Sequence, residues 1–146
     1  SQIGVVFSMT YNNRNKSVNN KYFVGLRINS STNVDANNPV PYEVYAGTSG
    51  HGVTVSNGVI SLPEGEFIVE FSILAEYNVT FGAKIYKDNA EVANAPDILQ
   101  HLSDGLTTSM LTSAYPFSGN CDIELRVTQD VHPVSIYSDC LIVRLN

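Results

Sequence analysis

The most constraining feature of this sequence is a period-two alternation of apolar and polar side chains along most of its 146 residues. In the stretch 66–73 the alternate positions are Phe67, Val69, Phe71 and Ile73. Successive side chains of a strand point to opposite faces, so this alternation is typical of a strand with one buried face. The chain also contains 17 Val, 10 Ile and 9 Thr, whose branched side chains favour a pleated sheet. The sequence therefore predicts an all-β protein.

The alternating segments predict eight to ten short strands, at the spacing of roughly 8–12 residues that antiparallel sandwiches and barrels show. Strands are expected at 5–11, 22–28, 42–46, 66–73, 79–86, 106–113, 121–128 and 135–145. The segment 12–20 is expected to connect the first two of them. Residues 91–105 are expected to form a loop with one short helical excursion at 97–102, because that helical pattern is too short to be stable alone.

Length and charge limit the possible partners. The chain has the size of one domain, and it carries 8 Lys+Arg against 14 Asp+Glu, for a net charge of −6 with no basic cluster. Phosphate binding needs positive charge, so no nucleic acid partner is expected. No apolar run reaches the roughly 18–20 residues that cross a bilayer, and the start lacks the order of a signal peptide. We expect one soluble domain over residues 1–146, with no membrane partner and no appended segment.

The sequence offers no enzymatic motif. It contains no Gly-rich phosphate loop, Ca²⁺ loop, Cys-x-x-Cys pair or nucleophile elbow. His51, His101 and His132 fall in separate predicted loops, at no spacing that builds a metal site. Carboxylate pairs such as Glu64 with Glu66 have the chemistry of a glycosidase dyad, but nothing in the sequence places them in one cleft. We predict no catalytic residues, no metal and no cofactor.

The two cysteines lie on the last two predicted strands. In a simple hairpin Cys121 and Cys140 would fall opposite each other, so a disulfide is geometrically conceivable. Without a signal peptide, two reduced and buried thiols are the favoured interpretation.

Two blocks of the chain resemble the tumour necrosis factor (TNF) and complement globular-head superfamily. In the block 58–92 a strand with alternating aromatics follows the turn Pro63-Glu-Gly65, and the next strand carries an apolar run into the turn Lys87-Asp-Asn-Ala90. In the block 118–146 a Gly-x-Cys-Asp-Ile segment resembles the family's penultimate strand, and Leu141-Ile-Val-Arg-Leu145 resembles its last one. The opening Val6-Phe7-Ser8 resembles its first strand.

The resemblance implies an antiparallel two-sheet jelly-roll sandwich of ten strands that assembles as a compact trimer. It also implies that Cys121 and Cys140 belong to different sheets. Nothing in this resemblance supplies an active site.

The parity of the strands, meaning whether their odd- or even-numbered side chains face the core, suggests an interface for that trimer. If the odd-numbered apolar residues of 67–73 and 141–145 fill the core, Ile68, Glu70, Ile142 and Arg144 point to the outer face. Our hypothesis is that Glu70 and Arg144 pair near the threefold axis, ringed by the two isoleucines. The alternative is that these four are ordinary surface residues, since scattered exposed isoleucines need no explanation.

The polar composition suggests recognition loops. The chain holds 15 Asn and 15 Ser together with 8 Tyr, and such residues give rigid contact area and adaptable hydrogen bonds. The stretches 12–20, 30–41, 47–52 and 95–104 are the candidate loops, and Tyr42, Tyr45, His51 and His101 are the candidate recognition residues.

Free-standing trimeric jelly rolls of the resembled type serve bacteriophages as capsid decorations, spikes and fibre heads. The resemblance therefore implies a non-enzymatic virion surface protein, a homotrimer that binds the capsid protein of its own virion. It would cement neighbouring capsomers or present loops to a host surface glycan or protein. Two alternatives stay open: a secreted, extracellular binding module of the complement-head type, and a carbohydrate-binding or carbohydrate-hydrolysing jelly roll.

Overall fold

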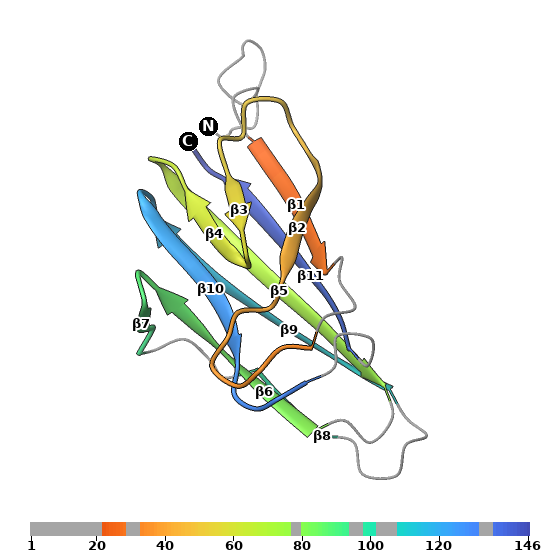
Figure 1. The fold of residues 1–146 in the computed structure, drawn as a ribbon. Coiled ribbons are helices and arrows are strands. Elements are labelled where there is room, and N and C mark those ends of the chain that lie inside the picture. Colours follow the sequence, from red (N-terminus) through yellow and green to blue (C-terminus); the bar gives the residue numbers. More distant parts are fainter. Residues whose placement is uncertain (1–21, 29–32, 77–79, 94–97, 102–107, 132–135) are drawn as a thin grey trace.

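The computed structural model describes residues 22–28, 33–76, 80–93, 98–101, 108–131 and 136–146 (Figure 1). The strands in these ranges are β1 (Tyr22–Ile28), β2 (Tyr42–Gly47), β3 (Thr54–Ser56), β4 (Val59–Leu62), β5 (Glu66–Glu76), β6 (Thr80–Lys87), β7 (Ala90–Glu91), β8 (Ile98–His101), β9 (Thr108–Ser118), β10 (Cys121–Val127) and β11 (Ile136–Arg144). Within these ranges no helix has the length and apolar character needed to cross a membrane. The predicted strand 5–11 and the connection 12–20 lie outside the described residues.

The strands form two antiparallel sheets. One has the order β2-β1-β11-β5-β9, and the other has the order β3-β4-β10-β6-β7, with β8 also paired to β6. Figure 1 shows strands of both sheets running along a common diagonal. Neighbouring strands such as β1 and β11 are far apart in the sequence, as in a jelly roll, where long connections cross between the sheets. The predicted all-β, two-sheet jelly-roll sandwich is confirmed.

The core lies between the two sheets. From β5 it receives Phe67, Val69, Phe71 and Ile73, which are all at most 1% exposed. From β10 it receives Ile123, Leu125 and Val127, also at most 1% exposed. Fully burying a side chain of this size contributes roughly 1.5–3 kcal/mol, so these two strands carry much of the stability. The parity predicted for both strands is confirmed.

The parity predicted for the last strand was wrong. Strand β11 pairs with β5 so that Ile142 lies opposite Val69 and Leu141 lies opposite Glu70. Directly opposed residues share a face of the sheet, so Ile142 joins Val69 in the core and is 1% exposed, whereas Leu141 is 43% exposed. Residues 140–143 are all apolar, so the alternation of apolar and polar residues cannot indicate whether the odd- or the even-numbered ones face the core. The pairing with β5 makes the choice.

Two other elements differ from expectation. The predicted helical excursion at 97–102 was wrong, because residues Ile98–His101 form β8 and pair with β6. Backbone hydrogen bonds to an available sheet edge outweigh the weak preference of one isolated helical turn. Strand β9 extends to Ser118 and contains Pro116. A proline is tolerated there because β9 is the edge of its sheet, where one side of the strand needs no ladder partner.

Candidate functional site

The outer side of the five-stranded sheet carries an apolar surface. We call it the outer apolar face, and its members are Phe23, Tyr45, Ile68, Leu141, Val143 and Leu145. Cross-strand pairing places Phe23, Val143, Ile68 and Pro116 in one continuous row over β1, β11, β5 and β9. Six large apolar side chains are strongly exposed in the described part of the chain, and five of them lie on this face. Contiguous exposed apolar patches mark interaction sites.

Tyr45 belongs to the outer apolar face because of a glycine. A Cβ atom at Gly25 would lie 2.9 Å from Cε1 of Tyr45, so a larger residue there would push the ring away from its place on the sheet. The Arg27 guanidinium lies 3.7 Å from the centre of the same ring, in a cation–π contact. The sequence prediction placed Tyr45 in a recognition role, and the structure places it on strand β2 with its ring against β1.

Two residues of the hypothesised interface do not lie on this face. Arg144 lies opposite Phe67 in the ladder, so it points away from Glu70. Its Nε donates to the backbone oxygen of Asn146 at 2.8 Å, and its Nη2 donates to the backbone oxygen of Glu64 at 2.8 Å. The placement of Arg144 and Ile142 on the outer face was therefore wrong, and a pair between Glu70 and Arg144 does not form within the chain. Ile68 and Glu70 do lie on the outer face, where both are exposed.

The outer side of the other sheet is polar and internally paired. Arg126 Nε and Nη2 donate to the two carboxylate oxygens of Glu124, each at 3.0 Å. The Arg126 guanidinium also lies 4.0 Å from the ring centre of Tyr86. Lys84 and Glu91 form a second ion pair at 3.4 Å. These described charges already have partners on the same surface, and the strongly exposed apolar side chains described above gather on the other sheet.

The structure places the remaining predicted recognition residues in different environments. Tyr42 is 2% exposed, and its hydroxyl makes a 2.5 Å hydrogen bond with the Ser138 hydroxyl, so its predicted recognition role was wrong. Burial raises the pKa of Tyr42 well above its ordinary value. His51 lies partly buried between β2 and β3, where its Nδ1 accepts a hydrogen bond from the Val53 N–H at 2.9 Å. His101 lies on β8, and its side chain is outside the described part.

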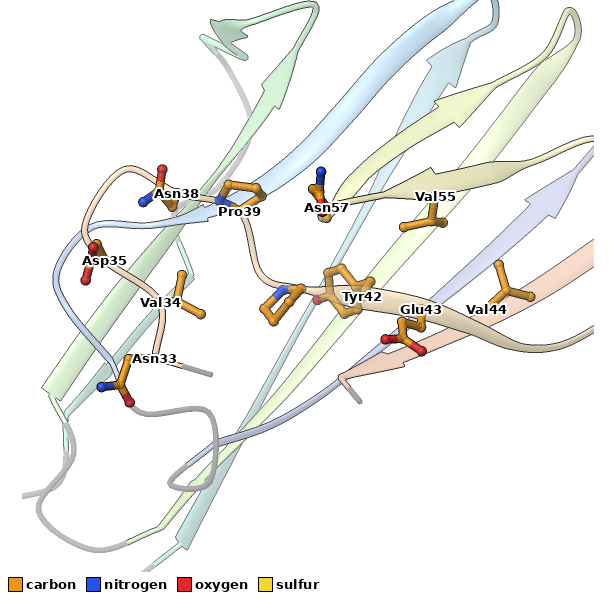
Figure 2. A pocket seen from close by; sticks show the side chains of 12 residues that line it. Asn33, Val34, Asp35, Asn38, Pro39, Tyr42, Glu43, Val44, Val55 and Asn57 are labelled. Carbon is orange, nitrogen blue, oxygen red and sulfur yellow. The ribbon is translucent and has the colours of Figure 1, made fainter. Parts of the chain in front are cut away.

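A groove opens beside the start of β2. It has a volume of about 890 Å³ and lies between the segment 33–41, the beginning of β2 and the turn that joins β3 to β4. Figure 2 shows side chains from these three segments around the hollow. The candidate recognition stretch 30–41 thus borders a groove, and the sequence signal for it was the density of Asn with two nearby prolines. No such signal indicated that Val55 and Asn57 would form the opposite wall.

The walls of this groove are fixed by backbone contacts. The Val40 N–H donates to the Leu125 oxygen at 2.8 Å, which ties the segment 33–41 to β10. The Ala36 N–H donates to a carboxylate oxygen of Asp130 at 2.8 Å. Gly58 packs so closely against the segment that a Cβ there would lie 2.6 Å from the Val40 oxygen. The segment therefore lies at a set distance from the β3–β4 turn.

Replacing Gly58 with Ala is expected to destabilise the fold more than replacing Gly50 with Ala. Both glycines have a φ near 80°, so both substitutions share the cost of a left-handed backbone. At Gly50 the nearest atom to a Cβ is 3.6 Å away, so only Gly58→Ala adds a collision. We expect Gly58→Ala to lower the free energy of unfolding by about 1–3 kcal/mol more than Gly50→Ala, measured by urea denaturation. Equal losses would contradict the close approach.

The two cysteines are free and buried, as predicted. Cys121 lies on β10 and Cys140 on β11, which belong to different sheets, so the alternative of a hairpin disulfide was wrong. Burial raises the pKa of both thiols above the ordinary value of 9.0. A raised pKa keeps each thiol in its unreactive protonated form.

Alkylation should reveal this burial. At pH 8 iodoacetamide is expected to modify the folded protein slowly, and to modify two thiols when the protein is unfolded without reductant. Folding favours the protonated form of Cys140, so this contribution to stability is complete below pH 9.0 and declines as the pH rises further. Mass spectrometry would count the labels. Failure to label either thiol in the unfolded chain would contradict two free cysteines.

In the described ranges, no three His, Cys, Asp or Glu side chains come together as a metal-binding group.

Known proteins share the fold of this chain at low sequence identity. The globular domain of zebrafish complement 1qA superposes with a TM-score of 0.65 at 9% identity, over 86% of this chain and 98% of the other. Eiger TNF from S. frugiperda gives a TM-score of 0.59 at 17% identity, over 85% and 92%. The PRD1 vertex protein P5 gives a TM-score of 0.56 at 11% identity, over 86% and 97%.

Searches with the amino-acid sequence alone find no match. No protein-family model matches the sequence, and no curated protein matches it. At identities this low the likeness concerns the backbone arrangement and not the site residues. The fold of this chain is the TNF-like jelly roll.

Proposed function

We propose that this protein is a non-enzymatic virion surface protein, a single domain over residues 1–146 that assembles as a homotrimer. The observation that carries the proposal is the outer apolar face. Five of its side chains are between 40% and 52% exposed, although each is large and apolar. A surface of this kind gains free energy when a second copy covers it, at roughly 25 cal/mol for each Å² of apolar surface removed from water.

A closed ring of three copies uses two different patches on every subunit. The outer apolar face supplies one of them. The second is proposed to be the edge at β9, where the half-buried Tyr115 packs on the buried Phe117 with ring centres 5.2 Å apart. A hollow of about 500 Å³ beside them is lined by Val92 and Pro116 among others. An apolar face on one subunit and an aromatic edge on the next are complementary in chemistry.

The virion role rests on a further analogy. The likeness to the PRD1 vertex protein P5 supports a place on a capsid, where the protein would cement neighbouring capsomers or present loops to the host. The partners would be other copies of this chain and the capsid protein of the same virion. Fold alone does not decide function, so the proposal needs a direct test.

The test is addition of the purified protein to capsids assembled without it. We expect binding that saturates at a multiple of three copies per capsid, and a cementing role would also raise the temperature at which the capsids disrupt. Mass measurement of the capsids and light scattering during heating give the two readouts. Absence of saturable binding would overturn the virion role.

A second candidate is a secreted binding module of the complement-head type. The likeness to the zebrafish complement 1qA domain favours it, because its TM-score of 0.65 exceeds the 0.56 of the vertex protein. The two roles predict different gene neighbourhoods. Flanking capsid and portal genes would support the virion role, and an upstream signal segment or collagen-like repeat in the same reading frame would support the secreted one.

A further inference from the structure

We infer that the groove beside β2 binds a neutral carbohydrate. The inference depends on the chemistry of the groove and is independent of the virion role and of trimer formation. The polar lining consists of Asn33, Asp35, Asn38, Glu43 and Asn57, and the apolar lining includes Pro39, Pro41, Val44 and Val55. A volume of about 890 Å³ lies within the range of roughly 300–1,000 Å³ that is usual for small-molecule sites.

The amide groups of the groove are available to a ligand. Asn33, Asn38 and Asn57 are exposed, and so is the Asp35 carboxylate. In the part of the chain that the structure describes, none of these four side chains has a hydrogen-bond partner. An amide offers both a donor and an acceptor, and a hydroxyl group is also both. Several exposed amides around one hollow therefore suit a ligand that carries many hydroxyl groups.

The charge of the lining determines which sugars fit. Asp35 and Glu43 line the groove, and the described residues of its lining include no Lys, Arg or His. A sialylated, sulfated or phosphorylated glycan would bring a negative charge close to the exposed Asp35 carboxylate, which repels it. A neutral sugar has no such cost, because its hydroxyl groups donate to carboxylate oxygens.

The apolar lining supplies the complementary contact. Val44 is 44% exposed, and Pro39, Pro41 and Val55 are partly exposed, so aliphatic surface lies next to the amides. A pyranose ring presents C–H groups on its faces and hydroxyl groups around its edge. Figure 2 shows the matching separation in the groove, with Val44 and Val55 at one end and Asn33, Asp35 and Asn38 at the other. Tyr42 is buried and supplies no stacking surface.

The site is already formed before a ligand arrives. The segment 33–41 is held to β10 by the Val40 bond to Leu125 and to Asp130 by the Ala36 bond. The Asn57 side of the groove is set by the close packing of Gly58 on Val40. A ligand therefore does not have to order these backbones, which removes one of the main entropic costs of binding.

The first experiment screens the intact protein against immobilised neutral oligosaccharides and their sialylated and sulfated counterparts. We expect binding to one or more neutral glycans and none that requires an acidic group. The best neutral oligosaccharide is then titrated in solution by isothermal calorimetry. Asp35→Ala and Asn38→Ala are each expected to weaken this binding about threefold to tenfold or more, by loss of one or two hydrogen bonds.

Glu64→Ala is the matched control. Like Asp35, Glu64 is an exposed carboxylate, but it lies outside the groove. The affinity of the Glu64→Ala variant for the same oligosaccharide should equal that of the unmodified chain. Thermal unfolding of all three variants checks that they are folded, and a surface substitution of this kind should leave the midpoint nearly unchanged.

Several outcomes would overturn the inference. These are the absence of neutral glycan binding at millimolar concentration, binding that Asp35→Ala and Asn38→Ala leave unchanged, or binding only of sialylated or sulfated glycans. A basic peptide that binds the groove while every neutral sugar fails would also overturn it. A protein that binds neutral sugars but not capsids would support the inference and reject only the virion role.

Discussion

Replacing Ile68 and Leu141 together with Asp is expected to dissociate the proposed trimer into monomers. The two side chains are 40% and 43% exposed in the single chain and adjoin each other on β5 and β11. In the proposed trimer both are buried, so each substitution removes apolar contact and places a charge in a dry interface. A loss of about 3 kcal/mol per contact weakens association by more than about a hundredfold.

Sedimentation velocity over a range of protein concentrations measures this effect. Val44→Asp is the matched control, because Val44 is 44% exposed but lines the groove and not the outer apolar face. Val44→Asp should remain trimeric at concentrations where Ile68→Asp already dissociates. A trimer that survives the double substitution would reject the outer apolar face as the interface, and an unmodified chain that stays monomeric at high concentration would reject self-association.

The second large effect concerns the parity of β11. Ile142→Ala is expected to lower the free energy of unfolding by about 2–5 kcal/mol, because Ile142 is 1% exposed and its truncation leaves a cavity between the sheets. Leu141→Ala removes a side chain of the same size from a position that is 43% exposed. Its expected cost is below about 1 kcal/mol in the monomer.

Urea denaturation of both variants gives the comparison. Both substitutions should be made in the Ile68→Asp background, so that trimer formation does not contribute to the measured stability. The slope of the transition should be similar in the two proteins. A larger loss for Leu141→Ala than for Ile142→Ala would show that Leu141 lies in the core, as the alternation of the isolated strand had suggested.

For strands with one predominantly apolar face, the buried face could be predicted from the sequence. In β5 the apolar residues at odd positions alternate with Glu66, Glu70 and Ser72, so only one face can be buried. The same holds for β10, where Asp122, Glu124 and Arg126 occupy the other parity. The turn after β6 was also predicted, because Asp88 and Asn89 tolerate the positive φ that both adopt.

The candidate sites could be predicted only in part. Ile68 was placed on the outer face correctly, because β5 has a clear pattern. Leu141 was predicted in the core and Ile142 on the outer face, and the structure shows the reverse. Both are apolar, so which of them faces the core depends on which residue of β5 lies opposite. Tyr42 was predicted to be a recognition residue because tyrosines among Asn and Ser suit contact surfaces, but its hydrogen-bond partner Ser138 is 96 residues away in the sequence. A local sequence pattern cannot indicate a contact between residues so far apart in the chain.

The class of fold, the parity of the strongly alternating strands and the lack of a basic cluster follow from the amino-acid sequence alone. These depend on the chemistry of neighbouring side chains and on a repeat of two residues. The parity of β11, the strand at 98–101 and the two walls of the groove became evident in the folded chain. Each of these features depends on hydrogen bonds or packing between segments that are far apart in the sequence. Such contacts form because an unpaired strand edge gains hydrogen bonds and an exposed apolar side chain becomes buried.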